Sequence, residues 1–205
     1  MTDEQLSKFA EKLQQAFDTT AAPVEDDPAV ALERDMQTLE VCVKEHGAQH
    51  ADTADALNDV GTDLLALDEY EEALAYYYQS LEIRKALFGE RQPETASSLS
   101  NIGGAYYQMG DKSRALTYGE QALATLRETR GDTHEDTLQV LANLAILLDD
   151  MHQSLRAYKL IDDALRSLPR DHAHYADLTN LRKDLCPPGF RPPSTSGATK
   201  KKKKR

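Results

Sequence analysis

The stretch "NIGGAYYQMGDKSRALTYGEQAL", residues 101–123, decides the fold because it reads as two helices joined by a short turn. The first helix has an apolar stripe with the spacing i, i+3, i+4 and i+7, formed by Leu99, Ile102, Gly103 and Tyr106. Pro93 suits the start of this helix, and Gly110 suits the position just past its end. The sequence therefore predicts a helix from about Pro93 to Met109.

The residues after Gly110 have a second helical pattern, which consists of Ala115, Leu116, Tyr118, Ala122 and Leu123. This helix is expected to stop near Gly131, so the unit is a helical hairpin. Gly104, Gly110, Lys112 and Ser113 also resemble a phosphate-binding loop, but the two glycines are one residue too far apart and Asp111 precedes the lysine. A phosphate loop joins a strand to a helix, and no strand is expected here.

The hairpin recurs along the chain with a period of 42 residues. Two columns repeat four times, namely Ala31, Ala73, Ala115, Ala157 and Leu39, Leu81, Leu123, Leu165. Four more repeat three times: Gly47, Gly89, Gly131; Thr53, Thr95, Thr137; Leu57, Leu99, Leu141; and Gly61, Gly103, Ala145. The last set, Gly61, Gly103 and Ala145, contains only small residues, which predicts that two helices cross closely at each of these positions.

A helical hairpin with small residues at the crossing resembles the tetratricopeptide repeat, whose usual period is 34 residues. The longer form seen in "LFGERQPETASSLSNIGGAYYQMG", residues 87–110, is similar to the repeats of kinesin light chains and related scaffold proteins. The resemblance covers about residues 28–168. It implies an all-α fold, a right-handed α-solenoid of stacked helical hairpins.

The expected organisation has an amphipathic helix, a linker, a repeat array and a tail. The amphipathic helix is expected at residues 1–17, the linker at 18–27, the repeat array at 28–185 and the tail at 186–205. The array is divided into a half-repeat 28–47, repeats 48–89, 90–131 and 132–170, and a capping helix 171–185. Residues 186–199 read as a flexible linker. The chain ends in six basic residues, Lys200, Lys201, Lys202, Lys203, Lys204 and Arg205.

The charge of the chain is divided between an acidic body and this basic tail. The formal net charge is −11, and without the six tail residues 18 basic residues stand against 35 acidic ones, a balance of −17. An acidic body repels nucleic acid, so any affinity for polyanions is expected in the tail. The tail has four candidate roles: an import signal, a contact with an anionic partner, a solubilising segment, or an intramolecular ligand for the acidic body.

No feature of the sequence predicts catalysis, a cofactor or a metal site. Cys42 and Cys186 are far apart and lack metal-ligand spacing, which fits a reducing compartment. The N-terminus lacks the apolar core of a signal peptide, and no stretch is apolar enough to span a membrane. We therefore expect a cytoplasmic protein, with the tail as a candidate signal for nuclear import. The pairs His46, His50 and His172, His174 read as solvated turn residues.

The resemblance to tetratricopeptide arrays implies that the first helix of each hairpin lines a concave groove. The candidate contacts for a peptide in this groove are Asp55, Asn58, Asp59, Thr62, Ser97, Asn101, Tyr107, Gln108, Gln139, Asn143 and Asp149. The same stripe also contains Leu65, Ala66, Ser100, Gly104, Ala142, Ile146 and Asp150. These eighteen positions include four Asp and no Lys or Arg. The stripe therefore favours neutral or basic peptides, and its amides are suited to the peptide backbone.

The leading hypothesis from the sequence is a non-enzymatic adaptor that binds an extended peptide. The alternative is a structural subunit of a larger complex, such as a kinesin-light-chain-like motor or a cytoskeletal assembly. Kinesin light chains use a long coiled coil before their repeats, and only 27 residues precede the first repeat helix here. The resemblance therefore predicts the type of repeat more strongly than the motor role.

Overall fold

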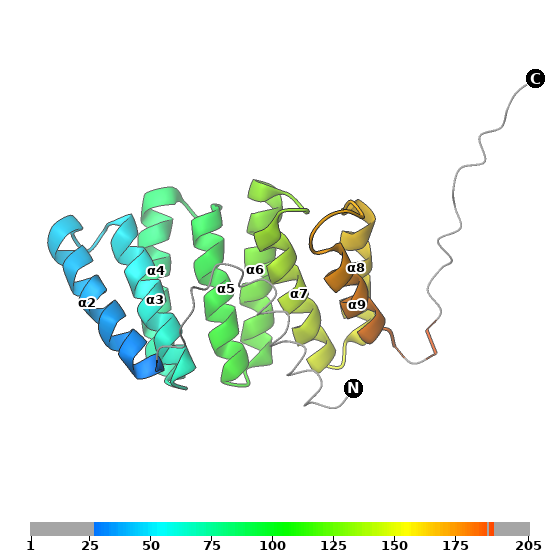
Figure 1. Cartoon of the computed structure of the whole chain (residues 1–205), viewed down its shortest axis with the longest axis horizontal. Helices are drawn as coiled ribbons and strands as arrows, with labels where there is room; N and C mark the ends of the chain where they lie inside the picture. The colour runs from blue at the N-terminus through cyan, green and yellow to red at the C-terminus, as the bar shows by residue number, and fades with distance from the viewer. Residues whose placement is uncertain (1–26, 188, 191–205) are drawn as a thin grey trace, which may run out of the picture.

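The structure is a computed structural model that describes residues 27–187, 189 and 190. Within these residues the regular structure is entirely helical, and the helices stand in a row (Figure 1). They are α2 (Pro28–His46), α3 (Ala51–Ala66), α4 (Tyr70–Phe88), α5 (Pro93–Gln108), α6 (Lys112–Arg130), α7 (Glu135–Asp150), α8 (Ser154–Ser167) and α9 (Tyr175–Asp184). The expected all-α array of helical hairpins is confirmed.

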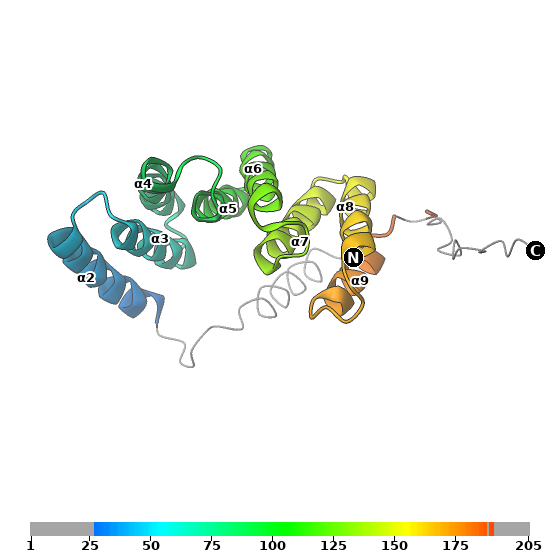
Figure 2. The same cartoon turned by 90° about the horizontal axis from the view of Figure 1, so that it is seen from above.

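The hairpins α3–α4, α5–α6 and α7–α8 stack in chain order. Figure 2 shows α3, α5 and α7 along the inner side of the curved row, with α4, α6 and α8 along its outer side. Gly104 lies inside α5 and Lys112 opens α6, so these residues belong to a helical hairpin and form no phosphate loop. The predicted groove residues belong to the three helices of this inner side.

Small residues allow the helices to cross closely, as the 42-residue register predicts. A Cβ atom added to Gly103 would lie 3.3 Å from the carbonyl oxygen of Ala115 on the next helix. At Gly61 an added Cβ would lie 2.7 Å from the Tyr77 ring, and Ala145 at the corresponding place in the third hairpin is fully buried. The contact at Gly103 is with backbone, which cannot move aside as a side chain can.

At the start of α3 and of α5, a threonine hydroxyl forms a hydrogen bond with the glycine that follows the preceding helix. Thr53 Oγ1 donates a hydrogen bond to the carbonyl oxygen of Gly47 at 2.8 Å, and Thr95 bonds to Gly89 at the same distance. Gly89 has φ of 101°, a conformation that side chains other than glycine rarely adopt. The hydroxyl of Thr137, the third member, is buried without a hydrogen-bond partner among the described residues. The loop before α7 therefore departs from the pattern.

The tyrosine run of α4 lies in the packing between helices. Tyr77 is buried, with 1 % of its surface exposed. The Tyr78 hydroxyl forms hydrogen bonds with the hydroxyls of Tyr106, at 3.0 Å, and Tyr118, at 2.7 Å. Arg114 lies over the Tyr106 ring, 4.3 Å from its centroid. These tyrosines join α4 to the α5–α6 hairpin.

The two ends of the described array differ. α2 has no fully buried residue, and Val30, Met36 and Val41 on it are exposed. α9 closes the other end with Leu178 and Leu181, which are buried. It begins at Tyr175, four residues later than the predicted capping helix, because residues 171–174 form a turn in which the Tyr175 N–H bonds to the His172 carbonyl. The predicted helix over residues 1–17 lies outside the described residues.

Candidate functional site

The predicted groove residues occupy α3, α5 and α7, and none of the eleven is fully buried. Asp55, Asp59, Thr62, Ser97, Tyr107, Gln108 and Asn143 are exposed, whereas Asn58, Asn101, Gln139 and Asp149 are half-buried. Helical spacing explains this common orientation, since residues three, four and seven apart share a face. All eleven side chains are therefore at least partly exposed to solvent.

An amide–amide hydrogen bond joins α5 to α3 on the face that carries the predicted groove residues. Asn101 Nδ2 donates to Asn58 Oδ1 at 2.7 Å, and Asp59 follows Asn58 in the chain. The Asp59 carboxylate is an acceptor, and each amide contains both a donor and an acceptor. Such a surface is suited to N–H groups of a peptide backbone and to cationic side chains.

Two of the four predicted groove aspartates have cationic partners that the stripe itself does not contain. Arg84 of α4 passes between the helices and its Nη2 lies 2.7 Å from Asp55 Oδ1. Lys112 of α6 lies 2.7 Å from Asp150 Oδ2, beside Tyr107. The expectation of uncompensated charge is therefore wrong at Asp55 and Asp150, because long side chains of the second helices reach the groove. Partial loss of hydration raises the pKa of the Tyr107 hydroxyl, and the Asp150 carboxylate adds to this effect.

The negative charge is concentrated where α2 meets α3, on Asp35, Asp59 and Asp63, which we call the acidic cluster. Partial loss of hydration raises the pKa of the Asp59 carboxyl, and Asp35 raises it further. The same two causes raise the pKa of Asp63 to about 6. Arg34 offsets part of this charge, with its Nε 3.0 Å from Asp35 Oδ1.

The sequence does not indicate Asp35 and Asp63 as site residues. Asp63 follows Asp59 by one helical turn, and this spacing is the one signal that could have drawn attention to it. Asp35 lies on the half-repeat helix, for which the sequence predicts no groove residue. Only the packing of α2 against α3 brings its carboxyl close to the other two.

The third hairpin differs from the first two on the groove side. Ala142 and Ile146, which the stripe placed in the groove, are 0 % and 8 % exposed and belong to the main hydrophobic core. The placement of these two residues at the groove surface is therefore wrong. The physical reason is that α7 is apolar around most of its circumference, so its aliphatic residues are buried on several sides at once.

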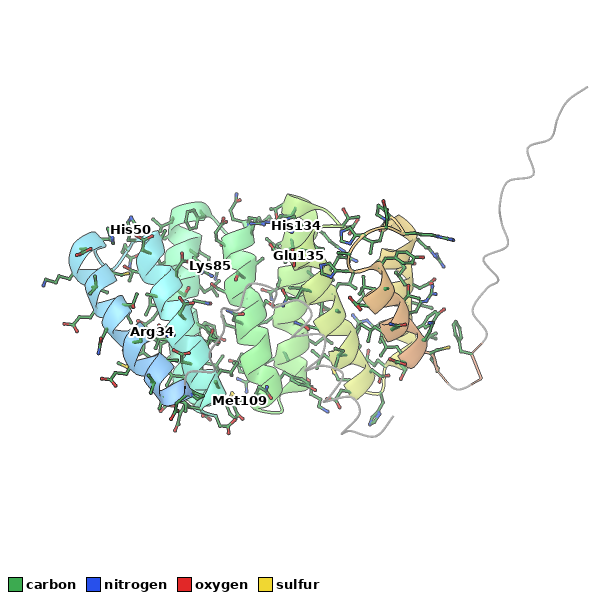
Figure 3. All side chains as sticks on the ribbon, viewed as in Figure 1. Arg34, His50, Lys85, Met109, His134 and Glu135 are labelled. Atoms are coloured by element: carbon green, nitrogen blue, oxygen red, sulfur yellow. The ribbon has the colours of Figure 1, made fainter. Side chains whose placement is uncertain are left out.

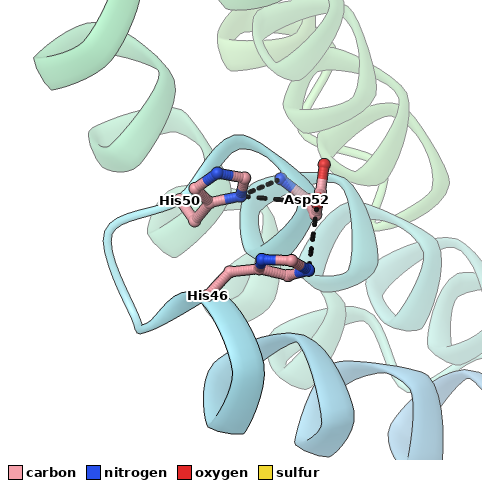
Figure 4. Close-up of side chains that lie close together, drawn as sticks. All are labelled: His46, His50 and Asp52. Carbon is pink, nitrogen blue, oxygen red and sulfur yellow. Dashed lines mark hydrogen bonds and ion pairs between the residues drawn. The ribbon is translucent and has the colours of Figure 1, made fainter.

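A second cluster lies at the corner between α2 and α3. Figure 4 shows the rings of His46 and His50 stacked beside Asp52. Asp52 Oδ2 is 3.5 Å from His46 Nε2 and 3.5 Å from His50 Nδ1. The sequence singles out the two histidines, but it does not indicate the carboxylate that joins them. The other pair, His172 and His174, has ring centroids 5.6 Å apart.

The predicted tail contacts, residues 200–205, lie outside the described residues. None of the described helices is long and apolar enough to cross a lipid bilayer.

Comparison with known proteins relates the chain to repeat proteins. The tetratricopeptide repeat family profile matches residues 25–86 and 53–128. No curated protein sequence gives a significant match. These matched residues cover α2 to α6, with the two hairpins that contain the hydrogen-bonded amides.

Solved structures show the same fold at low sequence identity. The crystal structure of the nearly identical TPR-like repeats of a protein named as a kinesin light chain of Podosopora anserina superposes with a TM-score of 0.68. The alignment has 17 % identity and covers 88 % of this chain and 85 % of that chain. A second crystal structure, of a variant of the same repeats, gives the same TM-score and identity and is covered over 84 % of its chain. BtubC (BKLC) from P. vanneervenii has a TM-score of 0.58 and 21 % identity, over 95 % of this chain and 79 % of that chain.

Proposed function

The chain belongs to the tetratricopeptide repeat family, and on that basis we propose that it is a non-enzymatic adaptor that holds an extended, neutral or basic peptide in its concave groove. Repeats of this family stack into arrays with an extended concave surface that binds other proteins. The coarse function, protein–protein interaction, is common to the family. The identity of the groove and the chemistry of its ligand are the parts that we propose for this chain.

The observation that carries the proposal is the combination of the acidic cluster with the hydrogen-bonded pair of amides beside it. The cluster holds three carboxyls, whose charge Arg34 and Arg84 offset only in part, and partial desolvation makes a negative charge on Asp59 or Asp63 costly. A cationic peptide side chain would relieve that cost, whereas an acidic peptide would increase it. The Asn101 and Asn58 amides lie next to this point and offer hydrogen bonds to a peptide backbone without reading its side chains.

The test uses extended peptides that are identical except for Lys, Gln or Glu at the same positions. Fluorescence anisotropy with the full chain should give the tightest binding for the Lys peptide and the weakest for the Glu peptide. Asp59→Lys should weaken binding of the Lys peptide and strengthen binding of the Glu peptide. Glu72→Lys makes the same charge change at an exposed position on α4, outside the groove, and should change neither affinity by a comparable amount. Tight binding of the Glu peptide to the unchanged protein would contradict the proposal.

The amides can be tested separately from the charge. Asn101→Ala removes the donor to Asn58 and should weaken the Lys, Gln and Glu peptides by similar factors, because it removes contacts with the backbone. A change confined to one peptide would indicate that Asn101 reads a side chain instead.

The proposal for the tail is a weak contact with the acidic body that salt reduces. Residues 200–205 carry six positive charges, and a Debye length of about 8 Å at physiological ionic strength screens their attraction to the body. Deleting these residues should increase the affinity of the groove for the Lys peptide at low salt, and the gain should shrink as salt rises. Equal affinities for both proteins at every salt concentration would leave the tail as an outward-facing signal or contact.

A structural subunit is the second candidate function, and the exposed apolar residues of α2 favour it. In the described part of the chain, Val30 is 56 % exposed, Met36 48 % and Val41 50 %, a pattern that permanent interfaces also show. Co-purification at low and moderate salt separates the two functions. A stoichiometric partner that resists salt supports the subunit, and an exchangeable partner that salt releases supports the adaptor.

A further inference from the structure

The corner between α2 and α3 gathers three metal-ligating side chains within a short segment. His46 is the last residue of α2, His50 caps the N-terminus of α3, and Asp52 lies in the first turn of α3. The three candidate ligand atoms, one from each residue, lie within 4.8 Å of one another. Figure 4 shows both imidazole rings directed toward the carboxylate.

The spacing of these atoms suits a small divalent transition-metal ion. Ligands at about 2.0–2.2 Å from a tetrahedral Zn²⁺ lie about 3.4 Å from one another. The Asp52 carboxylate is 3.5 Å from each imidazole nitrogen, so two of the three edges already have this length. A small rotation of the exposed histidine side chains would bring their two ligand nitrogens to the same distance from each other.

We propose that His46, His50 and Asp52 bind a divalent transition-metal ion, with Zn²⁺ as the best fit, and that water completes the coordination. Two imidazoles and one carboxylate are the ligand types that Zn²⁺ accepts, and three protein ligands leave a fourth position open. His50 Nδ1 accepts a hydrogen bond of 3.3 Å from the Asp52 N–H, so this nitrogen carries a lone pair that an ion could use. On binding, the ion would replace the Asp52 N–H as the partner of this lone pair, and water would accept the hydrogen bond from that N–H.

The corner before α7 provides an internal comparison at the same repeat positions. Arg130, His134 and Asp136 stand 84 residues after His46, His50 and Asp52. Arg130 Nη1 lies 3.0 Å from Asp136 Oδ2 and 3.3 Å from His134 Nε2. Figure 3 shows His50 and His134 along the same edge of the array, in the corners before α3 and α7. In the corner before α7, the Arg130 guanidinium therefore supplies a positive charge. In the corner before α3, the proposed metal ion would supply it.

The corner at α3 has no such cation of its own. Within the described chain, His46 and His50 are the side chains that lie within ion-pair distance of Asp52, and no Lys or Arg does. The corner before α5 has Phe88, Gln92 and Glu94 at these positions and cannot form a comparable set. Of the three corners, therefore, the first has the ligands and lacks the competing arginine.

The test is calorimetry with Zn²⁺ on the chelator-treated full chain without an affinity tag. Two variants use residues that the other corners already contain: His46→Arg copies Arg130 and His50→Gln copies Gln92, so both should fold, as circular dichroism will check. The unchanged protein should bind an ion that both variants lose or bind at least about 10-fold more weakly. The matched control His134→Gln, in the corner before α7, should bind as the unchanged protein does.

Two further measurements distinguish a bridging site from loose adsorption at the surface. Saturating Zn²⁺ should raise the melting temperature of the unchanged protein, because the ion joins the end of α2 to the start of α3, and should not raise that of His46→Arg. Co²⁺ should give visible absorption bands of a tetrahedral site, which His50→Gln should lose. Absence of binding, or equal binding by the unchanged protein and both variants, would overturn the proposal.

Discussion

Gly103 and Gly104 are neighbours in α5, yet they lie in opposite environments. A Cβ atom on Gly103 would press on the backbone of α6 at 3.3 Å from the Ala115 oxygen, whereas a Cβ atom on Gly104 would meet nothing within 4 Å. One residue belongs to the packed face of the first helices and the other to the groove face. The packed face repeats small residues at Gly61, Gly103 and Ala145, but the groove face changes from Thr62 to Gly104, and the third residue of that series, Ile146, is buried in the core.

The difference separates two physical tasks. The packed face must allow two backbones to approach, and only small residues do so, which makes its sequence nearly invariant from hairpin to hairpin. The groove face has no neighbour of fixed shape in the first two hairpins, so its residues are free to differ in size and charge. Changes on the packed face are therefore expected to affect folding, and changes on the groove face are expected to affect binding.

The largest effect is expected for Gly103→Leu. The added side chain would force α5 and α6 apart and cost about 1–3 kcal/mol or more of unfolding free energy. Ala115→Leu, on the opposite side of the crossing, should have a similar cost. Ser113→Leu is the control, because Ser113 is exposed near the hairpin turn. Urea unfolding measures all three, and equal midpoints would contradict the distinction between the two faces.

A large effect is also expected for Arg84→Leu, which links the two faces. The Arg84 guanidinium donates to Ser98 Oγ at 2.8 Å and to the Glu94 carbonyl at 3.2 Å, and it pairs with Asp55. Losing these charge-assisted bonds should cost about 1.5–3 kcal/mol. Asp55→Asn should cost less, about 0–1 kcal/mol, because Asp55 is 65 % exposed.

The same pair of variants should act on the groove in opposite directions. Arg84→Leu leaves the Asp55 carboxylate without its partner and should strengthen binding of the Lys peptide, despite the loss of stability. Asp55→Asn removes that carboxylate and should not strengthen binding. Anisotropy titrations well below the melting temperature of each variant will show whether Arg84, a buried residue of the second helix, sets the charge of the groove.

A smaller effect, dependent on pH, is expected for Asp63→Asn. The pKa of Asp63 is about 6 in the folded protein and lower in the unfolded chain, where hydration is complete. The folded state therefore holds the proton more tightly, and stability falls as pH rises from about 4 to 6. The amide removes this penalty, so the variant should melt at a higher temperature than the unchanged protein at pH 7.5 and at nearly the same temperature at pH 4. Glu72→Gln, at an exposed position on α4, is the control and should show no such difference.

The smallest effect is expected for Gly104→Ala. Nothing lies within 4 Å of the added methyl group, and alanine loses less backbone entropy than glycine inside a helix. The variant should therefore gain about 0.5–1 kcal/mol of unfolding free energy. A loss of stability would place Gly104 in a packed environment and contradict its assignment to the groove face.

Much of the fold could be predicted because its signals are local. The apolar stripe of α5, Pro93 at its start and Gly110 past its end all act within one or two helical turns, and they predict the helix to within a residue at its end. Because the pattern repeats every 42 residues, the same helices are predicted in the other hairpins. The register also indicates why Gly103 is small, since a residue that stays small in every repeat marks a crossing. These inferences need no knowledge of how distant side chains meet.

The candidate site depended on contacts that the register does not contain. Arg84 reaches Asp55 from another helix, Asp35 joins Asp59 from the half-repeat, and Asp52 completes the histidine corner across a turn. Each of these contacts depends on the length and direction of side chains on separate helices, so no spacing along the chain could predict it. The sequence alone determined the repeat and its helices. The tertiary structure decided which charges are neutralised there and which remain, because neutralisation requires two atoms within a few ångströms of each other.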